Sequence, residues 1–285
     1  MKKAFAYPYV IWMVLFIVAP LILVLYNSVT TTLPDGSVVF TLDYYRYFMS
    51  EVVPGNRIYI RVAIHSVQMA VYTTIICLIL GYPLAYILSS KGFSHKTFLI
   101  FMFIAPMWMN FLVRTYAWLA ILGRNGILNT FLQAIGLPAT PDILYTDAAV
   151  LLGMVYNFLP FMVLPIYTAL SRMDKRIIEA AEDLGADPKN VFLRIIFPLS
   201  VPGVISGITM VFMPAVATFI IPNLLGGRNY FMIGNLIEQQ FLRVGNRHFG
   251  SAVAVVLVIM MFVSMAVLSF VDKNKNEAED GGTTI

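Results

Sequence analysis

The residues of this sequence that could carry out chemistry do not form a catalytic or metal-binding pattern. The chain has one cysteine, Cys77, and three histidines, His65, His95 and His248, whose spacing is not that of metal ligands. The sequence contains no G-x-x-x-x-G-K-[ST] phosphate-binding loop. We therefore expect no catalytic residue, no metal site and no cofactor in this chain, which would not itself be an enzyme.

A second group of side chains, which could bind a solute, lies within or beside long apolar runs. A buried amide needs a hydrogen-bond partner, and its carbonyl oxygen can accept from an ammonium group. Aromatic rings attract cations, at about 0.5–2 kcal/mol each. The alternative for each ring is plain packing or a place in an interfacial aromatic belt. The candidates for binding a polar or cationic solute are Trp108, Asn110, Tyr116, Tyr156, Asn157 and Asn223.

The composition determines which elements must position these residues. Of the 285 residues, 59% are hydrophobic and 12% are charged, and the mean hydropathy is +0.81. A soluble domain has roughly 25% charged residues, so the sequence indicates an all-α polytopic membrane protein. The net charge of +4 fits cationic loops that set the membrane topology better than it fits nucleic-acid binding, which we do not expect.

Six apolar runs are long enough to cross a bilayer as helices. None of them contains an aspartate or glutamate, and we find no linker or internal repeat, so we expect a single membrane domain over 1–285. If the N-terminus is cytoplasmic, all eight lysines fall on the inner side, so we expect both termini in the cytoplasm. The predicted spans are 9–28, 62–88, 97–122, 148–170, 200–221 and 249–271, followed by a polar tail over 272–285.

The inner segment 171–198 is longer than a simple connection requires and predicts two short helices. In the first, over about 174–184, Ile177, Ala180, Ala181 and Leu184 form one apolar stripe at helical spacing. Gly185 then suits a left-handed C′ position, and Asp187-Pro188 suits the start of a second helix. An amphipathic hairpin on the bilayer surface is the alternative, but such helices prefer a basic polar face and this one is acidic.

This segment resembles the loop of permease subunits of binding-protein-dependent ABC importers. Glu179, Ala180, Ala181, Gly185, Ile195 and Pro198 match the pattern E-A-A-x3-G-x9-I-x-L-P, with Phe197 in place of the usual leucine. The resemblance implies the type I importer permease fold. It also implies that these six residues belong to a coupling loop that docks onto a cytoplasmic ABC ATPase dimer. It also implies that ATP and Mg are bound by that partner.

Further stretches are similar to the spermidine/putrescine permeases of this family. The resemblance implies a bacterial inner-membrane protein with a polyamine path shared with a second permease subunit, which would be a different chain. An extracytoplasmic substrate-binding protein would fill this path. Another small solute in the same family, an ion-coupled secondary transporter and an assembly factor without a solute path remain the alternatives. The supporting stretches are 40–44, 65–66, 80–83, 159–162, 225–227 and 233–235, together with Pro106, Asn110 and Arg114.

Overall fold

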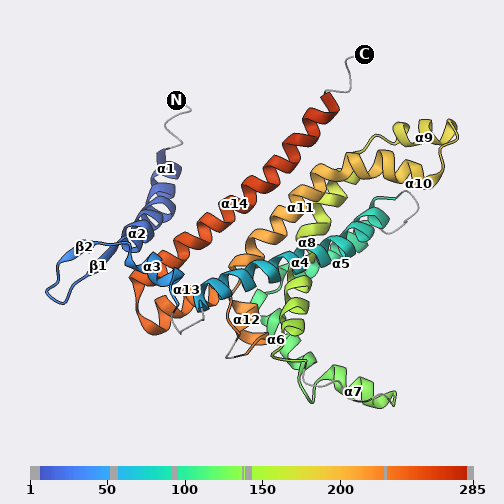
Figure 1. Ribbon diagram of the computed structural model, residues 1–285. Coiled ribbons are helices and arrows are strands. Elements are labelled where there is room, and N and C mark those ends of the chain that lie inside the picture. The colour runs from blue at the N-terminus through green and yellow to red at the C-terminus, as the bar shows by residue number, and fades with distance from the viewer. Residues whose placement is uncertain are drawn as a thin grey trace. The chain divides into compact units, whose positions relative to one another are not determined.

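The computed structural model describes residues 7–51, 57–90, 96–136, 138, 143–227 and 230–280, and most of this length is helical (Figure 1). The chain divides into two compact units. The first comprises residues 1–66 and 231–263, and the second comprises residues 67–230 and 264–285. The long helices α4 (Ile58–Ser89) and α14 (Arg247–Asp280) contribute residues to both units.

The first unit contains, besides parts of α4 and α14, the N-terminal helix and the segments around the last loop. Its elements are α1 (Tyr7–Met13), the π-helical segment η2 (Val14–Val18), α2 (Ala19–Ser28), β1 (Thr30–Thr32), β2 (Val38–Phe40), α3 (Asp43–Met49), α13 (Ile233–Gln239) and the π-helical segment η5 (Gln240–Val244).

The second unit holds the middle of the chain. Its elements are α5 (Lys96–Ile104), the 3-10 segment η3 (Ala105–Trp108), α6 (Phe111–Leu122), α7 (Ile127–Ala134), α8 (Asp147–Arg172), α9 (Lys175–Asp183), α10 (Pro188–Val191), the π-helical segment η4 (Phe192–Ile196), α11 (Phe197–Ala217) and α12 (Ile220–Leu225).

Among the described residues, five continuous helical stretches are long and apolar enough to cross a membrane. They are Pro8–Ser28, Ile58–Ser89, Asp147–Arg172, Pro188–Ala217 and Arg247–Val267, and each overlaps one predicted span. A pair of helices, Phe98–Trp108 and Phe111–Ala134, is bent by 95° and makes a sixth stretch when the two are counted together as one broken span. The fold is thus an all-α polytopic one, as predicted, and α14 continues as a helix to Asp280 through sequence that we expected to be a polar tail.

The predicted third span over 97–122 is therefore not one straight helix. Pro106 lies in the 3-10 turn η3, and Met109 and Asn110 have extended backbones, with ψ of 146° and 132°. The Asn110 side chain then caps α6 by accepting a hydrogen bond from the N–H of Leu112 at 2.8 Å. A proline that removes one helical bond, followed by an asparagine that restarts the helix, explains the break.

Two helices pass through a π-helical segment directly before a proline. In η4 the N–H of Phe197 donates to the carbonyl of Phe192, five residues back, and Pro198 follows. A proline ring clashes with the preceding turn of a regular α-helix, and the wider π turn makes room for it. Segment η2 stands in the same position before Pro20. Because of η4, the second loop helix and the predicted fifth span form one continuous helix from Pro188 to Ala217.

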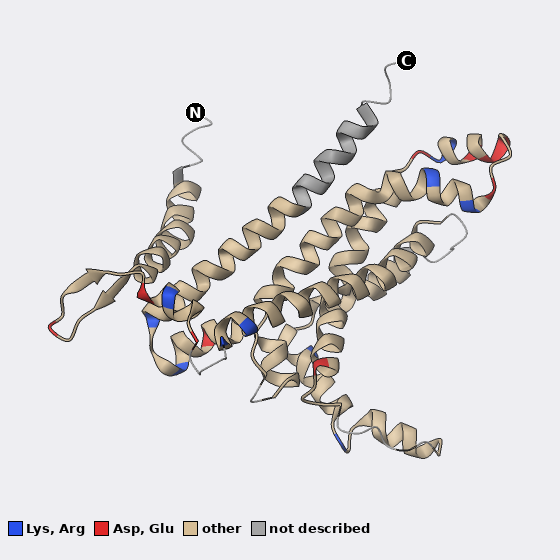
Figure 2. Cartoon of the chain, in the orientation of Figure 1, with Lys and Arg blue, Asp and Glu red and all other residues tan. Residues whose placement is uncertain are grey.

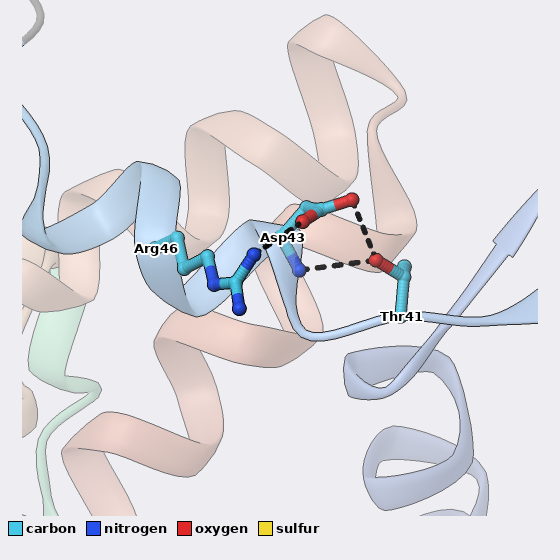
Figure 3. Close-up of polar contacts among 3 residues, drawn as sticks. All are labelled: Thr41, Asp43 and Arg46. Atoms are coloured by element: carbon cyan, nitrogen blue, oxygen red, sulfur yellow. Dashed lines mark hydrogen bonds and ion pairs between the residues drawn. The ribbon is translucent and has the colours of Figure 1, made fainter.

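The first unit is held together around Phe249 at the start of α14. Its ring contacts Tyr47 and Tyr59 edge-on, with centroids 5.2 Å and 5.0 Å away. At the start of α3, shown in Figure 3, the Thr41 hydroxyl accepts from the N–H of Asp43 at 3.1 Å and donates to its carboxylate at 2.7 Å. The exposed Asp43–Arg46 pair, at 3.8 Å, contributes little to stability.

The core of the second unit is the packing of α8 against α11, which run side by side in Figure 1. Two glycines of α11 make this contact close. A Cβ atom on Gly203 would lie 2.6 Å from the Cβ of Ala169, and one on Gly207 would lie 2.8 Å from the sulfur of Met162. Small residues that let backbones approach are typical of helix contacts in membranes. The loop between α8 and α11 is thus carried by two closely packed helices.

Candidate functional site

The predicted coupling loop forms a helical hairpin over residues 174–196, which we call the coupling hairpin. Its outer arm is α9, and its inner arm is α10 with η4. The side chain of Asp174 accepts from the N–H of Arg176 at 3.0 Å and so caps α9. At the other end, Gly185 has φ of +81°. Its N–H donates to the backbone carbonyl of Glu182 at 2.9 Å, and the N–H of Ala186 donates to the carbonyl of Ala181 at 3.0 Å. These two bonds and the left-handed glycine make a Schellman motif. The left-handed conformation predicted for Gly185 is confirmed.

The second helix of the hairpin starts as its sequence predicts. The carboxylate of Asp187 accepts from the N–H of Asn190 at 3.2 Å and from its side-chain amide, and Pro188 occupies the first helical position. From there the helix turns inward, because Val191 is 3% exposed and Ile196 is 6% exposed. The inner arm of the hairpin is thus anchored in the core of the second unit.

The outer arm presents its apolar stripe to the surroundings. Leu184 is 89% exposed, Ile177 is 47% exposed, Ala180 is exposed and Ala181 is half-buried. Leu184 and Gly185 border a groove of about 510 Å³ that also includes Ile195 and Arg194. A stripe of apolar residues on a sharply capped helix, uncovered by the chain's own described residues, is the surface expected of a docking element.

Two acidic residues of α9 lie away from this groove. Glu179 and Glu182 border a pocket of about 320 Å³, together with Lys175 and with Ser89 and Ser90 at the end of α4. The structure therefore places the six predicted coupling residues on different surfaces. Ala180 and Ala181 belong to the stripe, Gly185 and Ile195 to the groove, Glu179 to the pocket, and Pro198 to the half-buried start of α11.

Charge distinguishes the hairpin from the helices that carry it. Figure 2 shows red and blue residues gathered on α9 and α10, whereas α11 is tan throughout. This pattern is typical of a solvated segment at the end of two membrane helices. The charged residues of the hairpin are Asp174, Lys175, Arg176, Glu179, Glu182, Asp183, Asp187, Lys189 and Arg194.

The candidates for solute binding also separate by exposure. Five of them are accessible in the single chain: Trp108, Asn110, Tyr116, Tyr156 and Asn223. Trp108 and Tyr116 are 75% and 55% exposed. The Asn110 side-chain oxygen already accepts the hydrogen bond that caps α6, so its role in this conformation is structural. Tyr156 contacts Trp118 edge-on, with centroids 5.3 Å apart, which adds to the group an aromatic residue that the sequence analysis missed.

Asn157 differs from the other five because it is only 2% exposed. Its amide nitrogen donates to the carbonyl of Gly153 at 2.8 Å, and its Oδ1 atom is buried with no hydrogen-bond partner in the described part of the chain. A path shared by two chains would be lined by side chains that are exposed on each chain alone. In this conformation Asn157 therefore faces the core of its own unit rather than such a path.

A carboxylate at the beginning of α8 is engaged within the chain. Asp147 lies close enough to the phenol of Tyr230, a residue in the connection between α12 and α13, for its charge to act on that group. Burial raises the pKa of the Tyr230 phenol well above its usual value, and the charge of Asp147 raises it further. The phenol thus stays protonated at neutral pH. Among the described residues, no group of three histidine, cysteine, aspartate or glutamate side chains is arranged to hold a metal ion.

These features define a class of protein, a multi-pass helical membrane protein with a charged helical hairpin between two packed spans. Comparison with known proteins narrows the class. A family model described as "Binding-protein-dependent transport system inner membrane component" matches residues 77–275. The chain therefore belongs to this family and is a multi-pass inner-membrane component of a transport system, not the subunit that hydrolyses ATP.

Relatives of known sequence match nearly the whole chain. The spermidine/putrescine transport system permease protein PotB of Escherichia coli K12 is 39% identical over 260 residues, which is 90% of this chain and 92% of the relative. PotB of Haemophilus influenzae is 39% identical over 271 residues, 93% of this chain and 91% of the relative. The inner membrane ABC transporter permease protein YdcU of Escherichia coli K12 is 32% identical over 218 residues, covering 72% of this chain and 69% of the relative.

Solved structures show the same fold at low sequence identity. A chain of a bacterial ABC transporter that imports the acidic polysaccharide alginate matches with a TM-score of 0.78 and 14% identity, covering 97% of this chain and 95% of its own. A chain of the MetNI methionine ABC transporter matches with a TM-score of 0.60 and 17% identity, covering 80% of this chain and 99% of its own. The predicted ABC importer permease fold is confirmed.

Proposed function

We propose that this chain is a permease subunit of an ATP-driven importer of polyamines, spermidine or putrescine. The observation that carries the proposal is the 39% identity with PotB proteins over nine-tenths of the chain. The chemistry of the second unit agrees with it. Its exposed aromatic rings and amide oxygens are suited to ammonium groups, although the predicted spans contain no carboxylate that could pair with a polycation.

The coupling hairpin supplies the proposed contact with a cytoplasmic ABC ATPase dimer. Its exposed stripe and the groove beside Gly185 fit a protein partner better than a bilayer, since the polar face of α9 bears Glu179, Glu182 and Asp183. The partner dimer binds ATP and Mg. Docking there places the hairpin and both termini in the cytoplasm, in agreement with the distribution of lysines.

The proposed transport cycle follows from these contacts. ATP binding closes the ATPase dimer and moves the hairpin. This tilts α8 and α11, because α11 is continuous with α10 and only two residues join α8 to α9. A second permease chain completes the path, and an extracytoplasmic substrate-binding protein delivers the polyamine. One solved relative, the alginate transporter, was crystallised with a periplasmic protein bound to alginate pentasaccharide.

Uptake competition tests the substrate. Cells that lack this chain and cells in which it is restored are given labelled spermidine or putrescine, with an excess of unlabelled polyamine, sulfate or another unrelated solute. We expect the chain to restore uptake and only polyamines to compete. Uptake of polyamine that does not depend on the chain would contradict the proposal, and competition by another solute would assign that solute instead. Uptake driven by an ion gradient without ATP would favour a secondary transporter.

Tyr116 provides a test of the solute path. Its ring is 55% exposed on α6, and replacement by leucine removes a cation-binding face while keeping an apolar side chain. We expect Tyr116→Leu to lower uptake at limiting polyamine by about 2- to 30-fold, as the loss of one cation–π contact predicts. The matched variant Tyr116→Phe keeps the ring and should retain most uptake. Equal uptake by both variants would remove Tyr116 from the path.

A further inference from the structure

Four aromatic rings join the coupling hairpin to α4, and we call them the hairpin-base cluster: Tyr82, Tyr86, Phe192 and Phe197. Phe192 lies at its centre. Its ring meets Tyr86 edge-on with centroids 5.5 Å apart and an interplanar angle of 85°, and meets Tyr82 at 5.9 Å and 90°. Phe197 packs against Tyr82 at 5.8 Å and against Phe192 at 6.4 Å. Edge-to-face contacts of this kind have a preferred geometry, so they resist sliding as well as separation.

A hydrogen bond fixes one side of the cluster. Ser200 of α11 is fully buried, and its hydroxyl donates to the carbonyl of Phe197 at 2.8 Å. Because that bond uses the only hydroxyl proton of Ser200, the Tyr82 hydroxyl 2.9 Å away must be the donor to Ser200 Oγ. Tyr82 is thus tied to α11 by its hydroxyl and to η4 by its ring.

The cluster lies at the point where the inner arm of the hairpin can bend. Phe192 and Phe197 are the two ends of the π turn, since the N–H of Phe197 donates to the carbonyl of Phe192. Such turns are local irregularities in a helix and often mark functional positions. Both rings of this irregular turn contact α4, which contributes residues to both compact units of the chain.

We infer that the hairpin-base cluster passes the movement of the coupling hairpin to α4, with Phe192 as the central positioning residue. This inference rests on the proposed function, in which an ATPase moves the hairpin. When the hairpin moves, Phe192 moves with α10, and its two edge-to-face contacts push or pull Tyr82 and Tyr86 of α4. Without the ring, hairpin movement would reach α8 and α11 but would reach α4 less completely.

The experiment uses the complete transporter, purified and reconstituted in proteoliposomes with its binding protein. Three quantities are measured: the ATPase that co-purifies per permease, the rate of ATP hydrolysis, and the polyamine transported per ATP. For Phe192→Leu we expect co-purification within about twofold of wild type and transport per ATP lowered about fivefold or more, because both ring contacts are lost. Phe192→Tyr keeps the ring and should restore coupling. Tyr72→Leu, at an exposed ring elsewhere on α4, should behave like wild type.

A second pair of variants tests the cluster if Phe192→Leu assembles poorly. Tyr82→Phe and Ser200→Ala each remove the same hydrogen bond, so each should lower transport per ATP and the double variant should lower it no further. Unchanged transport per ATP in assembled Phe192→Leu, or additive losses in the double variant, would overturn the inference. Absence of a co-purifying ATPase from the wild-type complex would instead overturn the proposed function.

Discussion

Replacing Gly185 with valine is expected to reduce the amount of ATPase that co-purifies with this chain by roughly 5- to 30-fold. Gly185 has φ of +81°, and a side chain there would meet no atom within 4 Å. The penalty is therefore purely conformational, about 1–2 kcal/mol for a residue forced into the left-handed region, and larger when the residue is β-branched. The turn would open to relieve it, and the groove formed with Leu184 and Ile195 would change shape.

A graded series at this position separates backbone strain from steric conflict. Asparagine tolerates the left-handed region, alanine tolerates it less well, and valine least. Co-purification should therefore fall in the order glycine, asparagine, alanine, valine, while the amount of chain inserted in the membrane stays constant. Valine and asparagine variants that bind the ATPase equally well would show that the Schellman turn is not needed for docking.

The coupling hairpin was predictable because its signals are local. The sequence predicts a first helix over about 174–184, and the structure has α9 from Lys175 to Asp183 with Asp174 as its cap. Gly185 marks the end of the first helix and Asp187-Pro188 the start of the second, because each residue acts through its own backbone or within one helical turn. The membrane spans were predictable for a similar reason, because each is recognised from the length of one continuous apolar run.

Features that depend on irregular backbone or on packing were harder to predict. Pro198 indicates a helix start, but the π turn before it lets one helix continue from Pro188 to Ala217. The hairpin of β1 and β2 was missed, although Thr30–Thr32 and Val38–Phe40 are rich in β-branched residues and flank the turn-forming sequence Pro34-Asp35-Gly36. Asn110 and Asn157 look alike in sequence, yet one caps a broken helix and the other is buried. Which face of α8 is buried depends on α11 and α12, and no local pattern contains that information.

Replacing Leu184 with aspartate is expected to weaken ATPase binding by about 10- to 100-fold while leaving the chain folded. Leu184 is 89% exposed and lies next to the left-handed glycine, so its removal costs the isolated chain almost nothing. If a partner covers this side chain, however, burial of a leucine contributes about 1.5–3 kcal/mol to the complex. The effect should appear as loss of co-purified ATPase and of coupled uptake with unchanged thermal stability of the permease.

Leu242 offers a matched control for this variant. It is 78% exposed in η5, in the connection between the predicted fifth and sixth spans, and therefore on the side of the membrane opposite the proposed ATPase. Leu242→Asp adds the same charge at a similar exposure and should leave ATPase binding unchanged. An equal loss of binding in both variants would mean that a general effect of the added charge, and not a docking surface at Leu184, weakens the complex. Normal binding by Leu184→Asp would mean that the apolar stripe of α9 is not the surface that the ATPase covers.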